Sequence, residues 1–233
     1  MYVATNLFDV YDGHDYAPVR DMVVGPASRS DVNEFAQRWH YTATGGNMLW
    51  NYGLWDGYSL VGVVSYNLPT MPACSAFFGQ ENWEWVVHMG RLVCAEDAPR
   101  NTESRLISGS LRLLKKDRPI ARACVTYAAV SVGHIGYVYQ ATNALYLGTT
   151  QPDRYLIDNK GIRRSPRSRP DGSGASESEL YREMGWTLHK EPGKHRYVYL
   201  LGSKTERKEA LKLLNFPVLP YPKPLTQISV EGS

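Results

Sequence analysis

The sequence predicts a layered α/β (α+β) domain, in which helices flank a central mixed sheet. Segments rich in β-branched and aromatic residues alternate with amphipathic helical segments, the pattern expected when helices cover a sheet. Hydrophobic residues make up 43% of the 233 residues, enough for a sizeable core. We expect an irregular segment at 1–27, a single domain at 28–216 with a basic loop at 158–175, and a proline-rich tail at 217–233.

The first predicted helix lies in "SRSDVNEFAQRWHY" at residues 28–41. Ser30 or Asp31 can cap its first turn. The apolar residues at helical spacing fall on one face and comprise Val32, Phe35, Ala36 and Trp39. His40 and Tyr41 leave the C-terminal end of this helix.

A β-hairpin is predicted at residues 48–69, where two runs of aromatic and β-branched residues surround Asp56-Gly57, a strong type I′ turn signal. A loop with Pro69 and Pro72 follows. The alternating segment "NWEWVVHMGRLVCAED" at 82–97 then predicts a further strand.

Two strand–turn–helix units occupy the middle of the chain. The strand at 82–97 leads into a helix at 101–117, with apolar positions at Leu106, Leu111, Leu113 and Leu114. A strand at 121–130 leads into a second helix at 137–148, which Gly148 ends.

The sequence of the last third of the domain predicts two helices with capping boxes, with a strand between them in the chain. Residues 176–190 begin with a capping box of Ser176 and Glu179, and residues 203–216 begin with Ser203 and Glu206. Between them, "HRYVYLLG" at 195–202 predicts a late strand.

Composition narrows the class of protein. The three cysteines fit neither a disulfide framework nor a CxxC metal site, which favours a reducing compartment. No apolar run reaches 18 residues, and the N-terminus lacks the pattern of a signal peptide, so we expect a soluble, cytoplasmic protein without membrane contact.

One basic run stands out although the net charge is only +3. "KGIRRSPRSR" at 160–169 contains no acidic residue and carries Lys160, Arg163, Arg164, Arg167 and Arg169. Such a run is either a solvated loop or a site for nucleic-acid phosphates.

The turns after the two middle strands are the candidate sites for chemistry. "APRNTES" at 98–104 starts a helix whose free N–H groups could bind an anion, with hydroxyl contacts from Thr102 and Ser104, or it is an ordinary N-cap. "SVGHIGYVYQ" at 131–140 brackets His134 with glycines, and Tyr139 and Asn143 share one helix face. Taken singly, side chains at such positions more often serve capping or packing than chemistry.

The two units together resemble the core of the GNAT superfamily of acyltransferases, in which an amine-acylating site opens where two strands splay. "NALYLG" at 143–148 is similar to the Asn…Tyr…Gly helix of that superfamily, whose tyrosine is often the general acid. The resemblance makes 28–216 a GNAT-like catalytic domain. "PRNTES" at 99–104 replaces the usual glycine-rich pyrophosphate loop, which argues against acetyl-CoA as the donor.

A narrower resemblance is to the phage Mom family. It is carried by "WHY" at 39–41, "GRLVC" at 90–94, "NTESRLIS" at 101–108, "GHIGYVYQATNALYLG" at 133–148 and "KHRYVYLLG" at 194–202. The resemblance implies a GNAT-like transferase that converts adenine in phage DNA to its carbamoylmethyl derivative and so protects that DNA from host restriction. The rival hypotheses are a generic acyltransferase acting on a protein or small-molecule amine and a non-catalytic DNA-binding module.

The Mom resemblance also implies roles for individual residues. His40, Tyr41 and Tyr139 are the expected catalytic residues, with His40 as the base and Tyr139 as an acid or a positioning group. The groups expected to bind the donor's phosphate or developing negative charge are Arg91, Thr102, Ser104 and Asn143. The family carries an acidic residue at the position of Ala129.

Ala129 is therefore a departure from the family pattern at an expected catalytic position. An engineered inactive form, a natural variant and an alignment offset of one or two residues would each explain it. We favour a deliberate substitution, after which the chain binds its substrates without turnover.

The donor and the partners follow from the same resemblance. A carbamoylmethyl group contains the atoms of a glycyl group, so a glycine-derived donor such as glycyl-tRNA supplies every atom, whereas acetyl-CoA lacks the nitrogen. DNA, and with such a donor tRNA, are the expected partners. The family has been linked to iron, but no 2-His-1-carboxylate set can be placed in the sequence, so a metal remains unassigned.

The adenine amine is paired inside a duplex, so the base must be flipped out or single-stranded. Aromatic residues available for stacking are Trp39, Tyr41, Trp50, Tyr52 and Trp55, and none stands out in the sequence.

Overall fold

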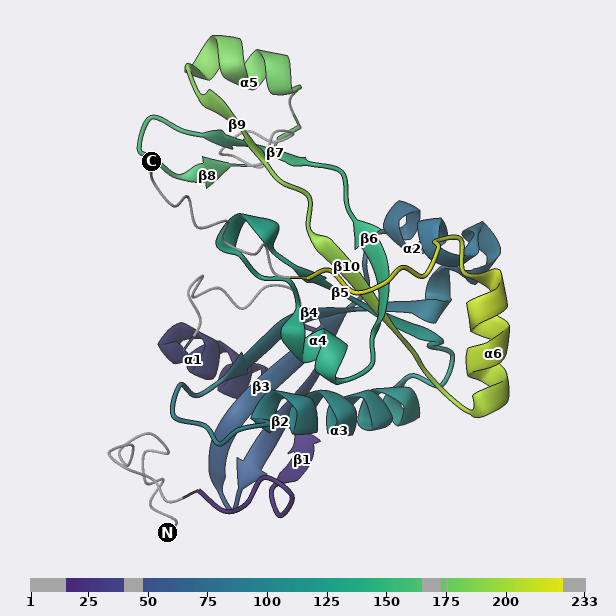
Figure 1. Ribbon diagram of the computed structural model, residues 1–233. Coiled ribbons are helices and arrows are strands. Elements are labelled where there is room, and N and C mark those ends of the chain that lie inside the picture. The colour runs from purple at the N-terminus through teal and green to yellow at the C-terminus, as the bar shows by residue number, and fades with distance from the viewer. Residues whose placement is uncertain (1–15, 40–47, 165–172, 175, 224–233) are drawn as a thin grey trace, which may run out of the picture.

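The central element is a mixed sheet of seven strands, seen in a computed structural model that describes residues 16–39, 48–164, 173–174 and 176–223 (Figure 1). Neighbouring strands are antiparallel except for β4 and β5, which run parallel. In spatial order the strands are β1 (Val23–Pro26), β2 (Trp50–Asp56), β3 (Ser59–Asn67), β4 (Val86–Cys94), β5 (Ala123–Ala128), β10 (His195–Leu200) and β6 (Leu145–Thr149).

Helices cover both faces of this sheet (Figure 1). Helix α3 (Thr102–Asp117) buries Leu106, Ile107 and Leu114 against one face. The opposite face packs in two clusters against α1 (Arg29–Trp39), α2 (Met71–Phe78) and α6 (Lys204–Leu213). The predicted α/β layers, with a mixed sheet flanked by helices, are therefore confirmed.

The strongest local signals in the sequence form the expected elements. Strands β2 and β3 make the predicted hairpin, and Gly57 adopts the positive φ of 59° that its tight turn requires. Helices α5 (Glu177–Met184) and α6 each begin with a complete capping box, in which the cap serine accepts from the N3 backbone N–H and the N3 glutamate accepts from the cap N–H.

The predicted helix at 137–148 is wrong beyond its first turn. Helix α4 (Tyr137–Ala141) is short, because Asn143 takes a left-handed φ of 61° and turns the chain into β6. Leu145 and Tyr146 then pair with Val198 and Tyr197 of β10. Pairing with a central strand outweighs the helical spacing of these apolar residues.

Three other segments differ from the expectation. The start of the predicted 82–97 strand is a 3₁₀ helix, η1 (Gln80–Trp85). The segment after Pro69, which we expected to be a loop, contains helix α2. Pro72 lies in the first turn of this helix, where the backbone nitrogen has no hydrogen-bond partner within the helix, so the proline is tolerated. Within the expected irregular segment, Val23–Pro26 forms the edge strand β1, while residues 1–15 lie outside the described residues.

A small second sheet is inserted between β6 and β10. Its order is β8 (Arg163–Arg164), β7 (Asp153–Ile157), β9 (Thr187–Glu191), and with α5 it packs its own core of Leu156, Leu180 and Trp186. Part of the expected basic loop at 158–175 is thus strand β8, and residues 165–172 and 175 are outside the described part of the chain. The backbone N–H of Thr150 donates to the carbonyl of Lys194 at 2.9 Å, which joins the two ends of the insertion.

The proline-rich tail packs on the main sheet as far as it is described. Leu219 forms a backbone bridge with Tyr146, and the Tyr221 hydroxyl donates to the Ala144 carbonyl at 2.9 Å. Among the helices of the described residues, none has the length and apolar character needed to cross a membrane.

Candidate active site

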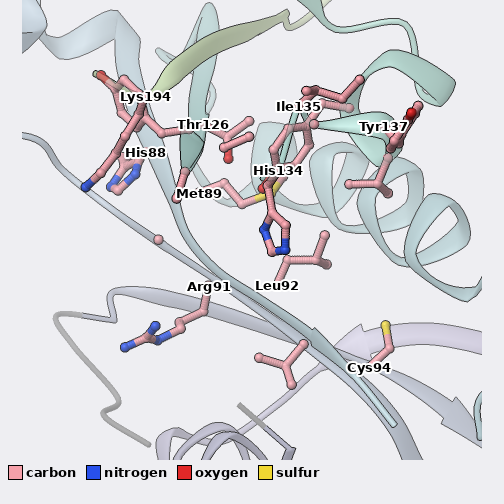
Figure 2. Close-up of a pocket in the computed structure, with 18 of the residues that line it drawn as sticks. His88, Met89, Arg91, Leu92, Cys94, Thr126, His134, Ile135, Tyr137 and Lys194 are labelled. Atoms are coloured by element: carbon pink, nitrogen blue, oxygen red, sulfur yellow. The ribbon is translucent and has the colours of Figure 1, made fainter. Parts of the chain in front are cut away.

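The main cavity lies where β4 and β5 diverge (Figure 2). The two strands pair only from Val86 to His88 on β4 and from Ala123 to Val125 on β5. Beyond His88 they separate, and a cavity of about 740 Å³ occupies the opening. Its walls come from β4, from the end of β5 and the turn after it, from the start of α4, and from Trp39 and Lys194.

A β-bulge in β4 determines which side chains face which side of the sheet. Ser65 of β3 pairs with Arg91 and Tyr66 pairs with Met89, so Gly90 is an extra residue. In Figure 2, Arg91 and Leu92 leave the strand on opposite sides. Leu92 packs with the α3 cluster, and Arg91 points to the other side. The bulge therefore directs Arg91 along the wall of the cavity.

Several cationic side chains line the cavity. Arg91 and Lys194 carry permanent positive charge at neutral pH, and His134 is an exposed side chain on the same wall. Among the described residues that line the cavity there is no Asp or Glu. Such a concave cationic surface attracts an anionic ligand.

His88 is a cavity residue that the sequence analysis did not single out. Its Nδ1 lies 3.1 Å from Oδ1 of Asn67, and its ring lies 5.5 Å from that of Tyr127. Burial, and secondarily the charge of Lys194, lowers the pKa of His88 to about 4, so the imidazole is neutral at neutral pH. An amide oxygen only accepts, so this contact places the proton on Nδ1 and leaves the Nε2 lone pair as a proton acceptor.

Tyr139 lines the cavity from α4, as expected of a functional tyrosine. It is half-buried, and its ring lies 5.5 Å from Tyr197. The turn before it is tightly fixed. Gly136 has a φ of 79°, and a Cβ there would lie 2.6 Å from the Tyr197 ring, so only glycine fits.

Ala129 also lines the cavity, directly after β5. Its backbone carbonyl accepts from the His134 N–H at 3.1 Å, which closes the turn containing η2 (Val130–Val132). A methyl group can neither accept nor donate a proton. An acidic side chain at this position would add a carboxylate to a wall that otherwise holds cations.

The other expected donor-binding residues lie apart from this cavity. Thr102 is buried, and its hydroxyl donates to the Pro99 carbonyl at 2.6 Å. Ser104 is half-buried in the first turn of α3 and is not among the cavity residues. Asn143 is exposed and lines a second cavity between α3 and α6. The structure thus brings together Arg91, Ala129 and Tyr139.

The remaining expected residues are only partly described. His40 and Tyr41 lie outside the described residues, although Trp39, directly before them, lines the cavity. Within the basic run, Lys160 is exposed, and Arg167 and Arg169 also lie outside the described residues.

The two described arginines of the basic run are engaged in ion pairs in the small sheet. Arg163 pairs with Glu191 at 2.9 Å and with Asp153 at 3.7 Å, and Arg164 pairs with Asp158 at 2.8 Å. Both therefore have acidic neighbours that the sequence run itself does not contain.

No group of three or more His, Cys, Asp or Glu side chains able to hold a metal ion occurs in the part of the chain that the structure describes. The cavity nevertheless holds two imidazoles, a guanidinium and an ammonium around one opening. These groups can attract an anion, accept a proton and stabilise developing negative charge.

Comparisons with known proteins identify relatives. The sequence model of the Mom protein family matches residues 21–223. The Methylcarbamoylase mom of Escherichia phage Mu is 25% identical over 178 residues, which cover 76% of this chain and 73% of the phage protein.

Solved structures similar to this chain include acetyltransferases at low sequence identity. An IAA acetyltransferase from Bacillus cereus is 12% identical and has a TM-score of 0.45 over 78% of this chain and 100% of that one. An aminoglycoside 6′-acetyltransferase type Ii is 8% identical and has a TM-score of 0.46 over 78% of this chain and 99% of that one.

Proposed function

This chain belongs to the Mom protein family, and we propose that it is a phage DNA modification enzyme that transfers a carbamoylmethyl group to the exocyclic amine of adenine in DNA. The observation that carries the proposal is the cavity between β4 and β5, which combines Arg91, Lys194 and His88 and has no acid among its described lining residues. This opening suits a polyanion that presents an amine.

The chemistry of adenine defines what the site must supply. Its amine is a poor nucleophile because the lone pair is delocalised into the ring, so the reaction needs a group that takes a proton as the new bond forms. Neutral His88, with its proton held on Nδ1 by Asn67, offers such a group within the cavity. His40 remains the candidate that the family resemblance suggests.

The cations of the cavity have two roles in this proposal. Arg91 and Lys194 attract the phosphates of the nucleic acid, and the Arg91 guanidinium stabilises negative charge that develops on the donor. Tyr139 lines the same cavity from α4 and either donates a proton or positions the base.

The donor belongs to the same proposal. A glycine-derived donor such as glycyl-tRNA contains every atom of the carbamoylmethyl group, but in a different order. In the balanced reaction the adenine nitrogen bonds to the glycine α-carbon and gives up one proton, the glycine nitrogen moves from the α-carbon to the carbonyl carbon, and the ester bond breaks so that tRNA leaves with that proton. tRNA then becomes a second nucleic-acid partner. Isotope-labelled glycine should label the modified base, and an unlabelled product would exclude a glycine-derived donor and turn attention to acetyl-CoA.

The test of function is mass spectrometry of nucleosides from plasmid DNA of cells that express this chain or its Ala129→Asp variant, with Arg91→Ala in each background as a matched control. Carbamoylmethyladenine from the aspartate variant alone would make position 129 part of the catalytic site. Modification by both chains would keep the function and remove position 129 from it.

Unmodified adenine from both chains would contradict the proposal. Salt-dependent DNA binding without modification would then indicate a non-catalytic DNA-binding module. Acylation of free amines with unmodified DNA would indicate a generic acyltransferase.

A further inference from the structure

Tyr137 is an exposed aromatic residue at the mouth of the main cavity. It is the first residue of α4, and its side chain is 64% exposed although it lines the cavity (Figure 2). A ligand that covered this ring would remove a large apolar surface from water. Its position suggests that a ligand covers it.

The other aromatic rings of the cavity are already in contact with protein groups. The ring centroids of Trp39 and Phe35 lie 6.4 Å apart, and Cζ of Arg38 lies 5.0 Å from the centroid of the Trp39 ring. Tyr127 contacts His88, and Tyr139 contacts Tyr197. Within the described residues, Tyr137 has no such ring contact. It therefore offers a face that is open to a ligand.

The backbone that carries Tyr137 is held in place. The Ile135 carbonyl accepts two hydrogen bonds, one from Nε2 of Gln140 at 3.0 Å and one from the hydroxyl of Tyr197. The positive φ of Gly136 and its close approach to Tyr197 fix the residue directly before Tyr137. An aromatic ring on a fixed backbone loses little conformational entropy when a ligand binds.

We propose that Tyr137 is a stacking surface for an unpaired base of the DNA strand that enters the cavity. The inference rests on the proposed function, which requires an unpaired adenine next to the reacting groups. A base has a flat π-face that stacks on a tyrosine, and the phosphates of its strand are attracted by the cations Arg91 and Lys194, which line the same cavity. Stacking on Tyr137 favours a flat base, and the cations favour an anionic strand. Together they favour a nucleic acid over an aliphatic amine.

The experiment measures binding of a single-stranded oligonucleotide in which 2-aminopurine replaces the adenine. Stacking quenches 2-aminopurine, and fluorescence anisotropy gives the affinity in the same titration. We expect quenching by the wild-type chain and an affinity for Tyr137→Ala that is lower by about 5- to 150-fold, with the quenching lost. Tyr137→Trp should retain both, because it keeps a flat ring.

Tyr58→Ala is the matched control. The Tyr58 ring is 93% exposed in the turn between β2 and β3 and lines none of the cavities described in the structure. Its removal should leave affinity and quenching unchanged. Near-ultraviolet circular dichroism checks folding, and Tyr137→Leu provides a second variant of similar bulk without a π-face.

Three results would overturn the inference. Wild-type affinity and quenching in Tyr137→Ala or Tyr137→Leu would exclude stacking on Tyr137 while leaving the proposed function intact. Equal losses in Tyr137→Ala and Tyr58→Ala would show a general effect of surface aromatics. No DNA binding by the wild-type chain would overturn the proposed function and this inference with it.

Discussion

Acidification should destabilise the protein through His88. Burial lowers the pKa of its imidazole from 6.5 to about 4, and the charge of Lys194 acts in the same direction. The unfolded chain therefore binds a proton more readily than the native protein between these two values. Stability is unaffected above pH 6.5, falls as the pH drops below it, and stops falling below about pH 4.

The size of this effect follows from the two pKa values. Between about pH 7.5 and pH 5, linkage predicts that His88 removes about 2 kcal/mol from the free energy of unfolding. A chain of this kind has a total stability of only about 5–15 kcal/mol, so the loss is large enough to measure.

The assay is urea unfolding followed by tryptophan fluorescence at a series of pH values, for the wild type and for His88→Asn. The asparagine amide can occupy the position of Nδ1 and donate to Asn67, so the variant keeps the hydrogen bond and loses the titrating group. The free energy of unfolding of His88→Asn should fall by about 2 kcal/mol less than that of the wild type over this range.

His134→Asn serves as the control, because His134 is an exposed histidine on the same cavity. Parallel pH profiles for the wild type and His88→Asn would refute the reasoning, since they would mean that His88 titrates alike in the folded and unfolded chains.

Three further outcomes follow from packing, capping and burial. Gly109→Ala should lower the free energy of unfolding by about 1–3 kcal/mol despite the better helix propensity of alanine, because the new Cβ would lie 2.5 Å from a methyl of Val24; urea unfolding should also show partial rescue by Val24→Ala. Ser203→Ala should cost about 1 kcal/mol by removing the cap of α6, whereas no change in the unfolding midpoint would mean that Glu206 alone holds this end. Burial raises the pKa of the Cys94 thiol, so iodoacetamide at about pH 8 should alkylate it far more slowly in the folded protein than in urea; equal rates by peptide mass spectrometry would contradict this.

Local signals in the sequence predicted the elements that depend on local physics. The hairpin of β2 and β3 and the capping boxes at Ser176 and Ser203 are confirmed because their hydrogen bonds join residues a few positions apart. The type I′ turn predicted at Asp56-Gly57 is wrong in detail, because Asp56 pairs with Ser59 and, of the two loop residues, Gly57 has a positive φ and Tyr58 does not. The segment at 145–149 was misassigned because its apolar spacing fits a helix, and only pairing with β10, some fifty residues later, makes it a strand.

The candidate site likewise contains some residues that sequence motifs indicate and others that they do not. Arg91 and Tyr139 were found through motifs, and the structure places both on one cavity. His88 and Lys194 were not singled out in the sequence, because only contacts between distant residues bring them to the cavity. Asn67 lies 21 residues before His88, and Lys194 lies where the inserted segment returns to the main sheet, hydrogen-bonded to Thr150, which is 44 residues earlier. No spacing rule within the sequence indicates either relation.

The way the small sheet is attached has an evolutionary consequence. Thr149 pairs with His195, and Thr150 is hydrogen-bonded to Lys194, so the intervening segment leaves and re-enters the main sheet at a single point, as a hairpin loop would. The core of the small sheet, which comprises Leu156, Leu180 and Trp186, lies entirely within this segment. A module attached in this way can be enlarged, trimmed or exchanged in one genetic event without breaking a strand of the catalytic scaffold. Its point of attachment lies beside Lys194 at the cavity, so each exchange would present a different surface next to the cavity.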